Sequence, residues 1–244
     1  NFLDTWSYSA AFNYGRVNTY YETRGNVLLS RFTNAVNAVR QDPANPSSPI
    51  VCAINTDANP ANDDPACRPL NLFGLGAPSP DALAYIGHTS SREQWSEQLN
   101  AVASITGDLG FAFELPGGPI GFALGGEWCR EKSFSSFDEV TRSGQTFLNA
   151  IANFEPPALN IWEAFGEVRM PILKDMPFAH ELSVEGAARV SSYNTGNTGT
   201  IWSYNVGGVY APIRDIRIRA NYGRAVRAPT QGDLFSAQSQ TFLN

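Results

Sequence analysis

The sequence predicts an all-β protein: a segment of an antiparallel, up-and-down transmembrane β-barrel, with about seven to eight long strands of a larger barrel and short helices in a long external loop. Three observations predict this fold. Apolar and polar residues alternate over stretches of roughly 11 to 20 residues, whereas strands of soluble proteins usually have about 5 to 6. The connections between the stretches are alternately long and short. Four of the five tryptophans fall at the same end of the stretches.

The first strand is predicted from Trp6. Its even positions, up to Tyr14, carry aromatic residues and alanine, and its odd positions are small and polar. This period of two is typical of a strand with one apolar face. We expect residues 23–92 to form a long external loop, since a connection of that length without strands is usually functional. Apolar residues from Leu28 to Val39 recur at helical spacing, and Ser79-Pro80-Asp81 is a start signal for a short helix through Ile86.

The next two predicted strands flank a tight turn. Alternation resumes near residue 93 and continues to Leu109. Leu115-Pro116-Gly117-Gly118-Pro119 predicts a turn, after which a strand runs from Ile120 to Cys129. Residues 134–160 are then predicted to form a second external loop.

Four more alternating stretches follow, and they are joined by short turns. The turns are predicted at 174–177, 194–199 and 212–215. Short connections make an antiparallel meander the simplest topology. In each of these strands, alternate positions point to one face and carry the apolar residues, while many charged residues occupy the positions that point to the other face. Because charges need water or partners, we expect the charged face to border an aqueous lumen. The predicted lumen-facing residues are Glu163, Glu167, Arg169, Glu181, Glu185, Arg189, Arg217 and Arg219.

The tryptophans predict where the membrane interface lies. Trp95, Trp162 and Trp202 begin strands that run in one direction, and Trp128 ends a strand that runs in the other. All four should therefore reach the external rim, while Trp6 lies at the opposite rim. Indole rings prefer the headgroup layer, where the ring is apolar and the N–H still finds a partner. The alternative is that tryptophan simply favours strands.

Composition excludes several functions. A formal charge of −6 argues against a nucleic-acid partner. No run of about 18 apolar residues exists, so no transmembrane helix is predicted. The sequence carries no secretory signal, and we therefore expect it to be a piece excised from a longer chain. His88 and His180 are isolated from other ligand types, which predicts neither a metal site nor an enzyme, and no cofactor is expected.

The loop around the cysteines has two candidate features. Cys52 and Cys67 lie close together in a segment rich in Asn, Asp and Pro, which suggests a disulfide; two free thiols are the alternative. Asp57, Asp63 and Asp64 offer oxygen ligands for calcium, but their spacing does not match an EF-hand. Because Asp and Asn also favour turns for conformational reasons, a turn-rich loop is the favoured interpretation.

A motif near residue 220 resembles a known family. The run Arg217-Ile-Arg-Ala-Asn-Tyr-Gly-Arg-Ala-Val-Arg-Ala-Pro229 is followed by Leu234-Phe235. It resembles TonB-dependent receptors, whose barrels carry an aromatic–Gly–x–x–x–Arg–x–Pro motif, here Tyr222, Gly223, Arg227 and Pro229. Residues 67–74 and 118–127 also resemble recurring elements of that family. The resemblance implies a barrel of about twenty-two strands closed by an N-terminal plug. Neither the plug nor the TonB-binding segment is within this sequence.

The resemblance also implies a function. It predicts part of a receptor of the bacterial outer membrane that imports a scarce nutrient, such as a ferric siderophore or an oligosaccharide. The implied partners are outer-membrane lipid, the receptor's own plug domain, TonB and a nutrient ligand that the sequence does not name. A passive porin-type channel and a soluble β-sheet binding or adhesion protein remain alternatives. A plug domain upstream argues against the porin, and a monomer that is soluble without detergent argues against the membrane barrel.

Overall fold

The computed structural model describes residues 4–146, 150–195 and 198–236. The chain divides into two compact units. The first unit comprises Asn1–Val17, Ser96–Ser133 and Pro156–Ala237, and the second comprises Asn18–Trp95, Phe134–Glu155 and Gln238–Asn244. Because the two units are formed from alternating parts of the chain, long strands contribute residues to both.

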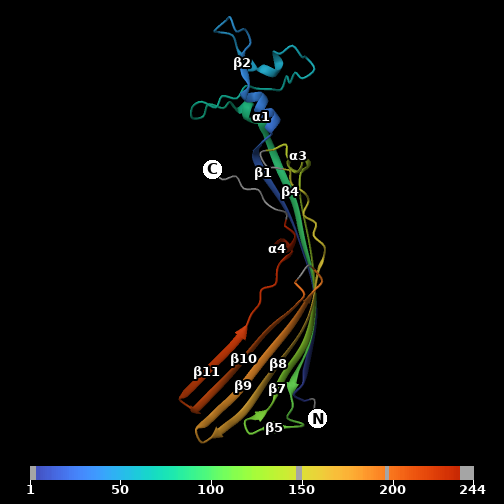
Figure 1. Cartoon of the computed structure of the whole chain (residues 1–244), viewed down its shortest axis with the longest axis vertical. Helices are drawn as coiled ribbons and strands as arrows, with labels where there is room; N and C mark the ends of the chain where they lie inside the picture. Colours follow the sequence, from blue (N-terminus) through green and yellow to red (C-terminus); the bar gives the residue numbers. More distant parts are fainter. Residues whose placement is uncertain (1–3, 147–149, 196–197, 237–244) are drawn as a thin grey trace. The chain divides into compact units, whose positions relative to one another are not determined.

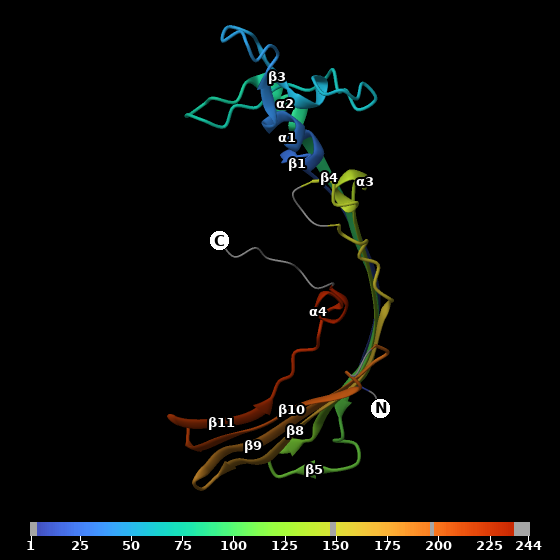
Figure 2. The same ribbon diagram turned by 45° about the horizontal axis from the view of Figure 1, so that its top comes forward.

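Within the described residues, seven long strands form one sheet. These strands are β1 (Ser7–Val27), β4 (Gly87–Asp108), β7 (Gly121–Phe137), β8 (Leu159–Met176), β9 (Ala179–Tyr193), β10 (Thr200–Ile213) and β11 (Ile216–Arg224). Their order in the sheet, β1-β4-β7-β8-β9-β10-β11, follows the order along the chain. In the first unit, β8, β9, β10 and β11 lie side by side in the views of Figures 1 and 2. The predicted all-β, antiparallel up-and-down architecture is confirmed.

The strands extend further than the alternation of their side chains. β1 reaches Val27 and β4 begins at Gly87, inside the segment 23–92 that was predicted as loop. β7 similarly continues to Phe137, within 134–160, and β8 begins at Leu159. Ladder hydrogen bonds join backbone groups and do not require an apolar face. Side-chain alternation can therefore lapse where both faces meet water, while the strand continues.

The turn between β8 and β9 lies later than predicted. β8 continues through Met176, so the turn consists of Pro177 and Phe178 rather than residues 174–177. The register shifts between Pro171 and Leu173, because a proline has no N–H to donate to the ladder. The predicted turn at 115–119 is a small hairpin of β5 (Glu114–Leu115) and β6 (Gly118–Pro119), in which Gly118 has a φ of 126°. Residues 196–197 of the predicted 194–199 turn lie outside the described residues.

The second unit contains the helices expected in the long loop. α1 (Leu29–Val36) and α2 (Pro80–Ile86) are both present, and Ser79 caps α2 by accepting a hydrogen bond from the backbone N–H of Ala82. A short sheet of β2 (Ala38–Arg40) and β3 (Ile50–Cys52) leads to a 3-10 turn, η1 (Ala53–Asn55). Among the described residues, no helix is long and apolar enough to cross a bilayer.

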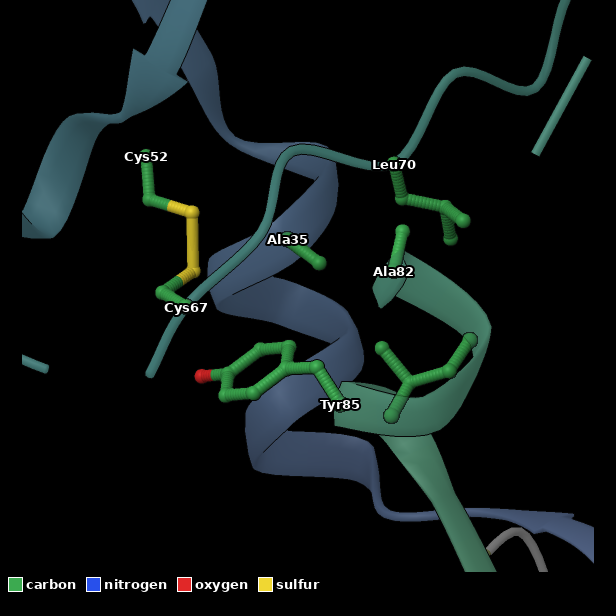
Figure 3. Packing of buried hydrophobic residues seen from close by; sticks show 7 residues of the cluster. Ala35, Cys52, Cys67, Leu70, Ala82 and Tyr85 are labelled. Carbon is green, nitrogen blue, oxygen red and sulfur yellow. A yellow bond between two sulfur atoms is a disulfide. The ribbon is translucent and has the colours of Figure 1, made fainter. Parts of the chain in front are cut away.

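A small hydrophobic core holds the second unit together. Its buried members, which Figure 3 shows, come from α1, α2, β3 and the segment after it: Ala35, Cys52, Cys67, Leu70, Ala82, Tyr85 and Ile86. Cys52 and Cys67, the pair for which the sequence suggested a disulfide, are joined by one. The backbone N–H of Leu70 donates to the carbonyl of Ala35 at 2.8 Å. The core therefore ties the polar segment to both helices.

Tyr85 connects this core to the polar segment 53–69. Its hydroxyl donates to the carboxylate of Asp64 at 2.6 Å. Burial, and then this hydrogen bond, raise the pKa of Tyr85 above its ordinary value. The guanidinium of Arg31 lies 5.5 Å from the centre of the same ring and donates to the carbonyl of Tyr85 at 3.1 Å. Several weak contacts thus fix one side chain of α2.

α3 (Glu139–Arg142) is attached to β4 through Asp138. The Asp138 carboxylate accepts hydrogen bonds from the backbone N–H groups of Thr141 at 3.0 Å and Ser91 at 2.9 Å, and it lies 3.0 Å from Nε2 of His88. Burial by itself opposes ionisation of Asp138, but these hydrogen bonds outweigh it and hold its pKa below the ordinary value. The charged form of Asp138 therefore anchors the helix.

We expect the disulfide to carry much of the stability of the second unit. Replacing both Cys52 and Cys67 by serine in the intact protein opens a loop closed over a separation of 15 residues, which lowers the free energy of unfolding by about 3 kcal/mol. Limited proteolysis should then cleave residues 38–79 faster than in the wild type. Cys129→Ser, which removes the free cysteine, is the matched control. Equal cleavage rates for the double variant and the control would contradict this role.

Candidate functional site

The sheet of the first unit has one apolar face that nothing in the unit covers. Register pairs place apolar side chains together on this face, including Trp128 with Trp162 and Val206 with Tyr222. Trp162 is 63% exposed, Val206 53% and Tyr222 71%. Of the hydrophobic residues described in this unit, only Leu159, Ala179 and Ala211 are buried. An exposed apolar surface of this extent marks contact with another apolar phase.

The opposite face carries the charged residues. Register pairs on this face include Glu163 with Ser191, Phe165 with Arg189 and Arg169 with Glu185. Glu167 lies opposite Ala187, and Arg219 lies opposite Val209. The structure therefore places on one face the eight charged residues singled out from the sequence: Glu163, Glu167, Arg169, Glu181, Glu185, Arg189, Arg217 and Arg219.

Arg189 links two carboxylates that face each other across neighbouring strands. Glu127 and Glu163 are direct register partners, an arrangement that like charges disfavour. Nη1 of Arg189 lies 2.9 Å from Glu163 and 3.5 Å from Glu127. Ser191 donates its hydroxyl hydrogen to Glu163, and the side-chain amide of Asn100 donates to Glu127 at 2.6 Å. This cluster joins β4, β7, β8 and β9 on the charged face.

An aromatic ring holds Arg189 in position. The guanidinium carbon of Arg189 lies 5.0 Å from the centre of the Phe165 ring. The ring lies over Gly125, where an added Cβ would come within 2.3 Å of the ring and 2.8 Å of the Ala103 carbonyl oxygen. Gly125 therefore leaves the space that Phe165 occupies. The sequence analysis did not identify Gly125, although a glycine opposite an aromatic residue on a neighbouring strand is a usable signal.

Further ion pairs and shallow grooves continue along the charged face. Arg217 lies 2.5 Å from Glu181, which joins β11 to β9. A groove of about 450 Å³ is lined by Phe165, Glu167, Arg189, Ser203, Asn205 and Arg224 among others. A neighbouring groove of about 410 Å³ is lined by Glu167, Arg169 and Glu185 among others. The face thus offers polar recesses between its charged side chains.

The segment after β11 turns back toward β7. It ends in α4 (Gln231–Phe235), whose capping residue Thr230 accepts from the backbone N–H of Asp233. The side chain of Gln231 is buried; it donates to the carbonyls of Glu131 at 3.2 Å and Pro157 at 3.0 Å. It also accepts a hydrogen bond from the Ser133 hydroxyl at 2.8 Å. Gln231 therefore satisfies carbonyls where β7 and the chain entering β8 separate.

The family-motif residues occupy this same region. Tyr222 lies on the apolar face of β11, and the backbone of Gly223 approaches the Tyr204 carbonyl, since an added Cβ would lie 3.3 Å from its oxygen. Arg227 pairs with Asp233 at 2.7 Å, and Pro229 directly precedes the helix cap. Sequence reasoning did not identify Gln231; the Thr230-x-x-Asp233 capping pattern was the available signal for α4.

The tryptophans fall into different surroundings. The rings of Trp128 and Trp162 lie 6.0 Å apart on the apolar face, and Trp202 lies opposite Val190 on the same face. Trp95 belongs to the second unit, where it stacks on Phe134 at 6.0 Å. Trp6 directly precedes β1; its N–H donates to the Asp108 carbonyl at 3.0 Å, and its ring and that of Phe122 form a T-shaped pair with centroids 5.1 Å apart.

The aspartates of the cysteine-containing loop serve the turns. Asp57 accepts from the backbone N–H of Asn59 at 2.8 Å, and Asp64 accepts from that of Ala66 at 3.0 Å as well as from Tyr85. In the part of the chain that the structure describes, no group of His, Cys, Asp or Glu is placed to hold a metal ion, so Asp57, Asp63 and Asp64 are not brought together as a calcium site. His180 lies 2.9 Å from Asp175 near the turn after β8.

Together, the meander of long strands, the uncovered apolar face and the paired charges on the other face define the wall of a membrane-spanning β-barrel. Within this class of membrane protein, the chain can be assigned to one family. The chain belongs to the family of TonB dependent receptor-like β-barrels, whose family model matches residues 1–244. That family consists of receptors of the bacterial outer membrane that act in transport and not as enzymes. No curated protein matches the chain, and no solved structure matches it.

We expect Gly125 to be more sensitive to substitution than its neighbour Gly126. Gly125→Ala forces Phe165 off the site and removes the support of Arg189, which should destabilise the barrel by about 1–3 kcal/mol. Gly126→Ala is the matched control, because its Cβ would lie 3.5 Å from the nearest atom, the Glu163 carbonyl oxygen. Urea unfolding in detergent measures both. Equal midpoints for the two variants would show that the packing over Gly125 carries no stability.

Proposed function

We propose that the chain forms part of the wall of an outer-membrane receptor that imports a scarce nutrient with energy delivered through TonB. The apolar face contacts lipid, and the charged face borders an aqueous lumen. The observation that carries the proposal is that the sheet of the first unit presents a large uncovered apolar face and, on its other side, charges that pair with one another. A bilayer on one side and water on the other stabilise both faces at once.

The energetics of the apolar face support a bilayer. Fully burying one large apolar side chain stabilises a protein by about 1.5–3 kcal/mol. Phe12, Leu124, Trp162 and Ile218 are among many that remain more than half exposed. If these side chains stayed in water, the protein would lack a stabilisation that is large compared with the free energy of unfolding of a domain, which is about 5–15 kcal/mol. Lipid on this face therefore gives the lower free energy.

The charged face supports a lumen. Arg189 is 43% exposed at its side chain while it pairs with Glu163 and Glu127, and Arg217 is 49% exposed while it pairs with Glu181. Pairs that are half hydrated retain water around their outer atoms, so they avoid the desolvation cost of a buried ion pair. In the complete receptor this face would border the plug domain or the solute.

The segments 23–92 and 134–160 are proposed to be external loops that contact the nutrient first. Each connects strands at the same rim, while the turns around 115–119, 177–178 and 214–215 connect them at the other. Long external loops and short periplasmic turns are typical of such barrels. A ferric siderophore or an oligosaccharide is the proposed cargo, and TonB and the plug are the proposed partners in the full-length receptor.

Adjacent positions on β10 test the two environments. In the full-length receptor with Cys129→Ser, we expect Asn205→Cys to react with a water-soluble maleimide and Val206→Cys to react far more slowly. Val206 lies on the apolar face and Asn205 on the other. A spin label at each position adds a second measurement, since a lipid-soluble relaxant should broaden only the label at 206. The opposite pattern, or equal reaction at both positions in cells, would overturn the barrel assignment.

Energy dependence separates the receptor from a passive channel. We expect cells expressing the full-length receptor to take up a hydroxamate siderophore loaded with radioactive iron, or a labelled maltooligosaccharide, and to lose this uptake when an uncoupler collapses the proton gradient. Cells lacking TonB should show the same loss. Uptake that persists in both conditions would instead identify a porin-type channel, because diffusion through an open lumen needs no energy. The matched control is a resident porin measured with its own solute.

A further inference from the structure

The segment that follows β11 forms a strap over the charged face. We name residues 225–236 the strap; Figure 2 shows it in red, running from the end of β11 to α4. It reaches β7 although β8, β9 and β10 lie between β11 and β7 in the sheet. There it contacts Glu131 and Ser133, which alternate with Glu127 along β7 and therefore lie on the charged face. The strap thus runs over the face that is proposed to border the lumen.

One side chain attaches the strap to the sheet. Of the residues of the strap, all of which the structure describes, only Gln231 is buried, with 6% of its surface exposed. Its amide group donates to the carbonyls of Glu131 and Pro157, and its oxygen accepts from the Ser133 hydroxyl. The other hydrogen bonds that the structure describes for the strap join its own residues. Attachment therefore depends on the donors and the acceptor of a single amide.

Local contacts make the part of the strap around α4 one rigid piece. Thr230 and Asp233 form a capping box, in which each side chain accepts a hydrogen bond from the backbone of the other. The carboxylate of Asp233 also pairs with Arg227 at 2.7 Å, and Pro229 has a fixed φ. If Gln231 leaves its partners, residues 227–235 should therefore move together rather than unfold.

A polar recess lies beside the attachment point. Its volume is about 500 Å³, and it is lined by residues of β1, β4 and β7 together with Gln231, among them Gly15, Gln98 and Glu131. The side-chain amide of Gln98 donates to the carboxylate of Glu131 at 2.9 Å. An added Cβ at Gly15 would meet no atom within 4 Å, so the space above this glycine is open. The strap and the sheet thus bound a space that a solute on the charged face can enter.

We propose that the strap limits access to this recess and that Gln231 is the positioning residue that holds it in place. While Gln231 is attached, the strap narrows the passage along the charged face; when Gln231 is released, the passage widens. Only one side chain is buried on attachment, so the two states differ by little more than three hydrogen bonds, which water can replace. The inference rests on the proposed function, because the strap can limit passage only if the charged face borders an aqueous lumen.

A distance measurement tests the attachment. In the full-length receptor with Cys129→Ser, spin labels at Asn205→Cys on β10 and Ser236→Cys on the strap should give one narrow distance distribution. Gln231→Leu should broaden it and add longer distances, because the attached state then leaves two buried carbonyls without a donor. Gln231→Glu should act alike, since a carboxylate has no N–H to donate. Gln145→Leu, the same exchange at an exposed position outside the strap, is the matched control.

A labelling experiment tests access to the recess. In the same background, Gly15→Cys should react with N-ethylmaleimide at similar rates whether or not Gln231 is replaced. Its reaction with the bulkier fluorescein maleimide should be about tenfold faster with Gln231→Leu, the factor that corresponds to about 1.4 kcal/mol of lost hydrogen bonding. Asn205→Cys, which lies on the charged face outside the recess, should react with both reagents at rates that Gln231→Leu does not change.

The outcomes distinguish a failure of this inference from a failure of the proposed function. A narrow distribution that both Gln231 variants retain, a broad one already in the wild type, or an unchanged rate at Gly15→Cys would refute the strap while the barrel assignment stands. If Asn205→Cys reacts with neither reagent, the charged face does not border water, and the proposed function fails together with the strap. A second label pair, Gly15→Cys with Asn205→Cys, should keep its distance in every variant, which shows that the sheet itself is intact.

Discussion

In the proposed function, the sheet of the first unit depends on two different solvents, lipid on its apolar face and water on its charged face. Its strands lack a packing layer among the described residues, so in the proposed function the stability that other proteins obtain from a core comes from the apolar face meeting lipid. Period-two alternation follows from this requirement, because each residue faces either the apolar phase or water. A slip of one residue in register would exchange the two faces along a whole strand. The proposed surroundings thus favour the continuous register that β7 keeps with β8 and β9 keeps with β10.

The charged face shows how side chains on neighbouring strands compensate one another's charge. Glu127 and Glu163 face each other, and Arg189 on the next strand neutralises part of their repulsion. Phe165, an aromatic residue on the polar side, supports that arginine, and Gly125 provides its space. These residues come from three neighbouring strands, β7, β8 and β9, so the cluster also links the strands laterally. Its half-exposed state keeps the pairs hydrated, which suits a surface that a solute or a plug domain would contact.

The second unit contains a polar segment that is held in a defined conformation without a hydrophobic face of its own. Residues 42–69 are rich in Asn, Asp and Pro and have no hydrophobic period. Their order comes from side chains that accept local N–H groups, as Asp57 and Asp64 do, and from the disulfide and Tyr85 that join them to α1 and α2. The aspartates that suggested calcium are thereby explained by turn formation. The helix signals at Leu28–Val39 and Ser79–Asp81 were reliable because each depends on residues only a few positions apart in the chain.

The sequence by itself determined the class of fold, the meander of long strands, the two faces and the helices of the second unit, because hydrophobic period and capping are local properties. Tertiary structure decided the ends of the strands, the turn at Pro177-Phe178, the role of Gln231 and the cluster around Arg189. Gln231 contacts Glu131 and Ser133 over separations of about one hundred residues, and no local pattern encodes a pairing of that range. A groove beside Trp128 and Trp162 likewise exists only once the sheet has brought small residues of β1, β4 and β7 together.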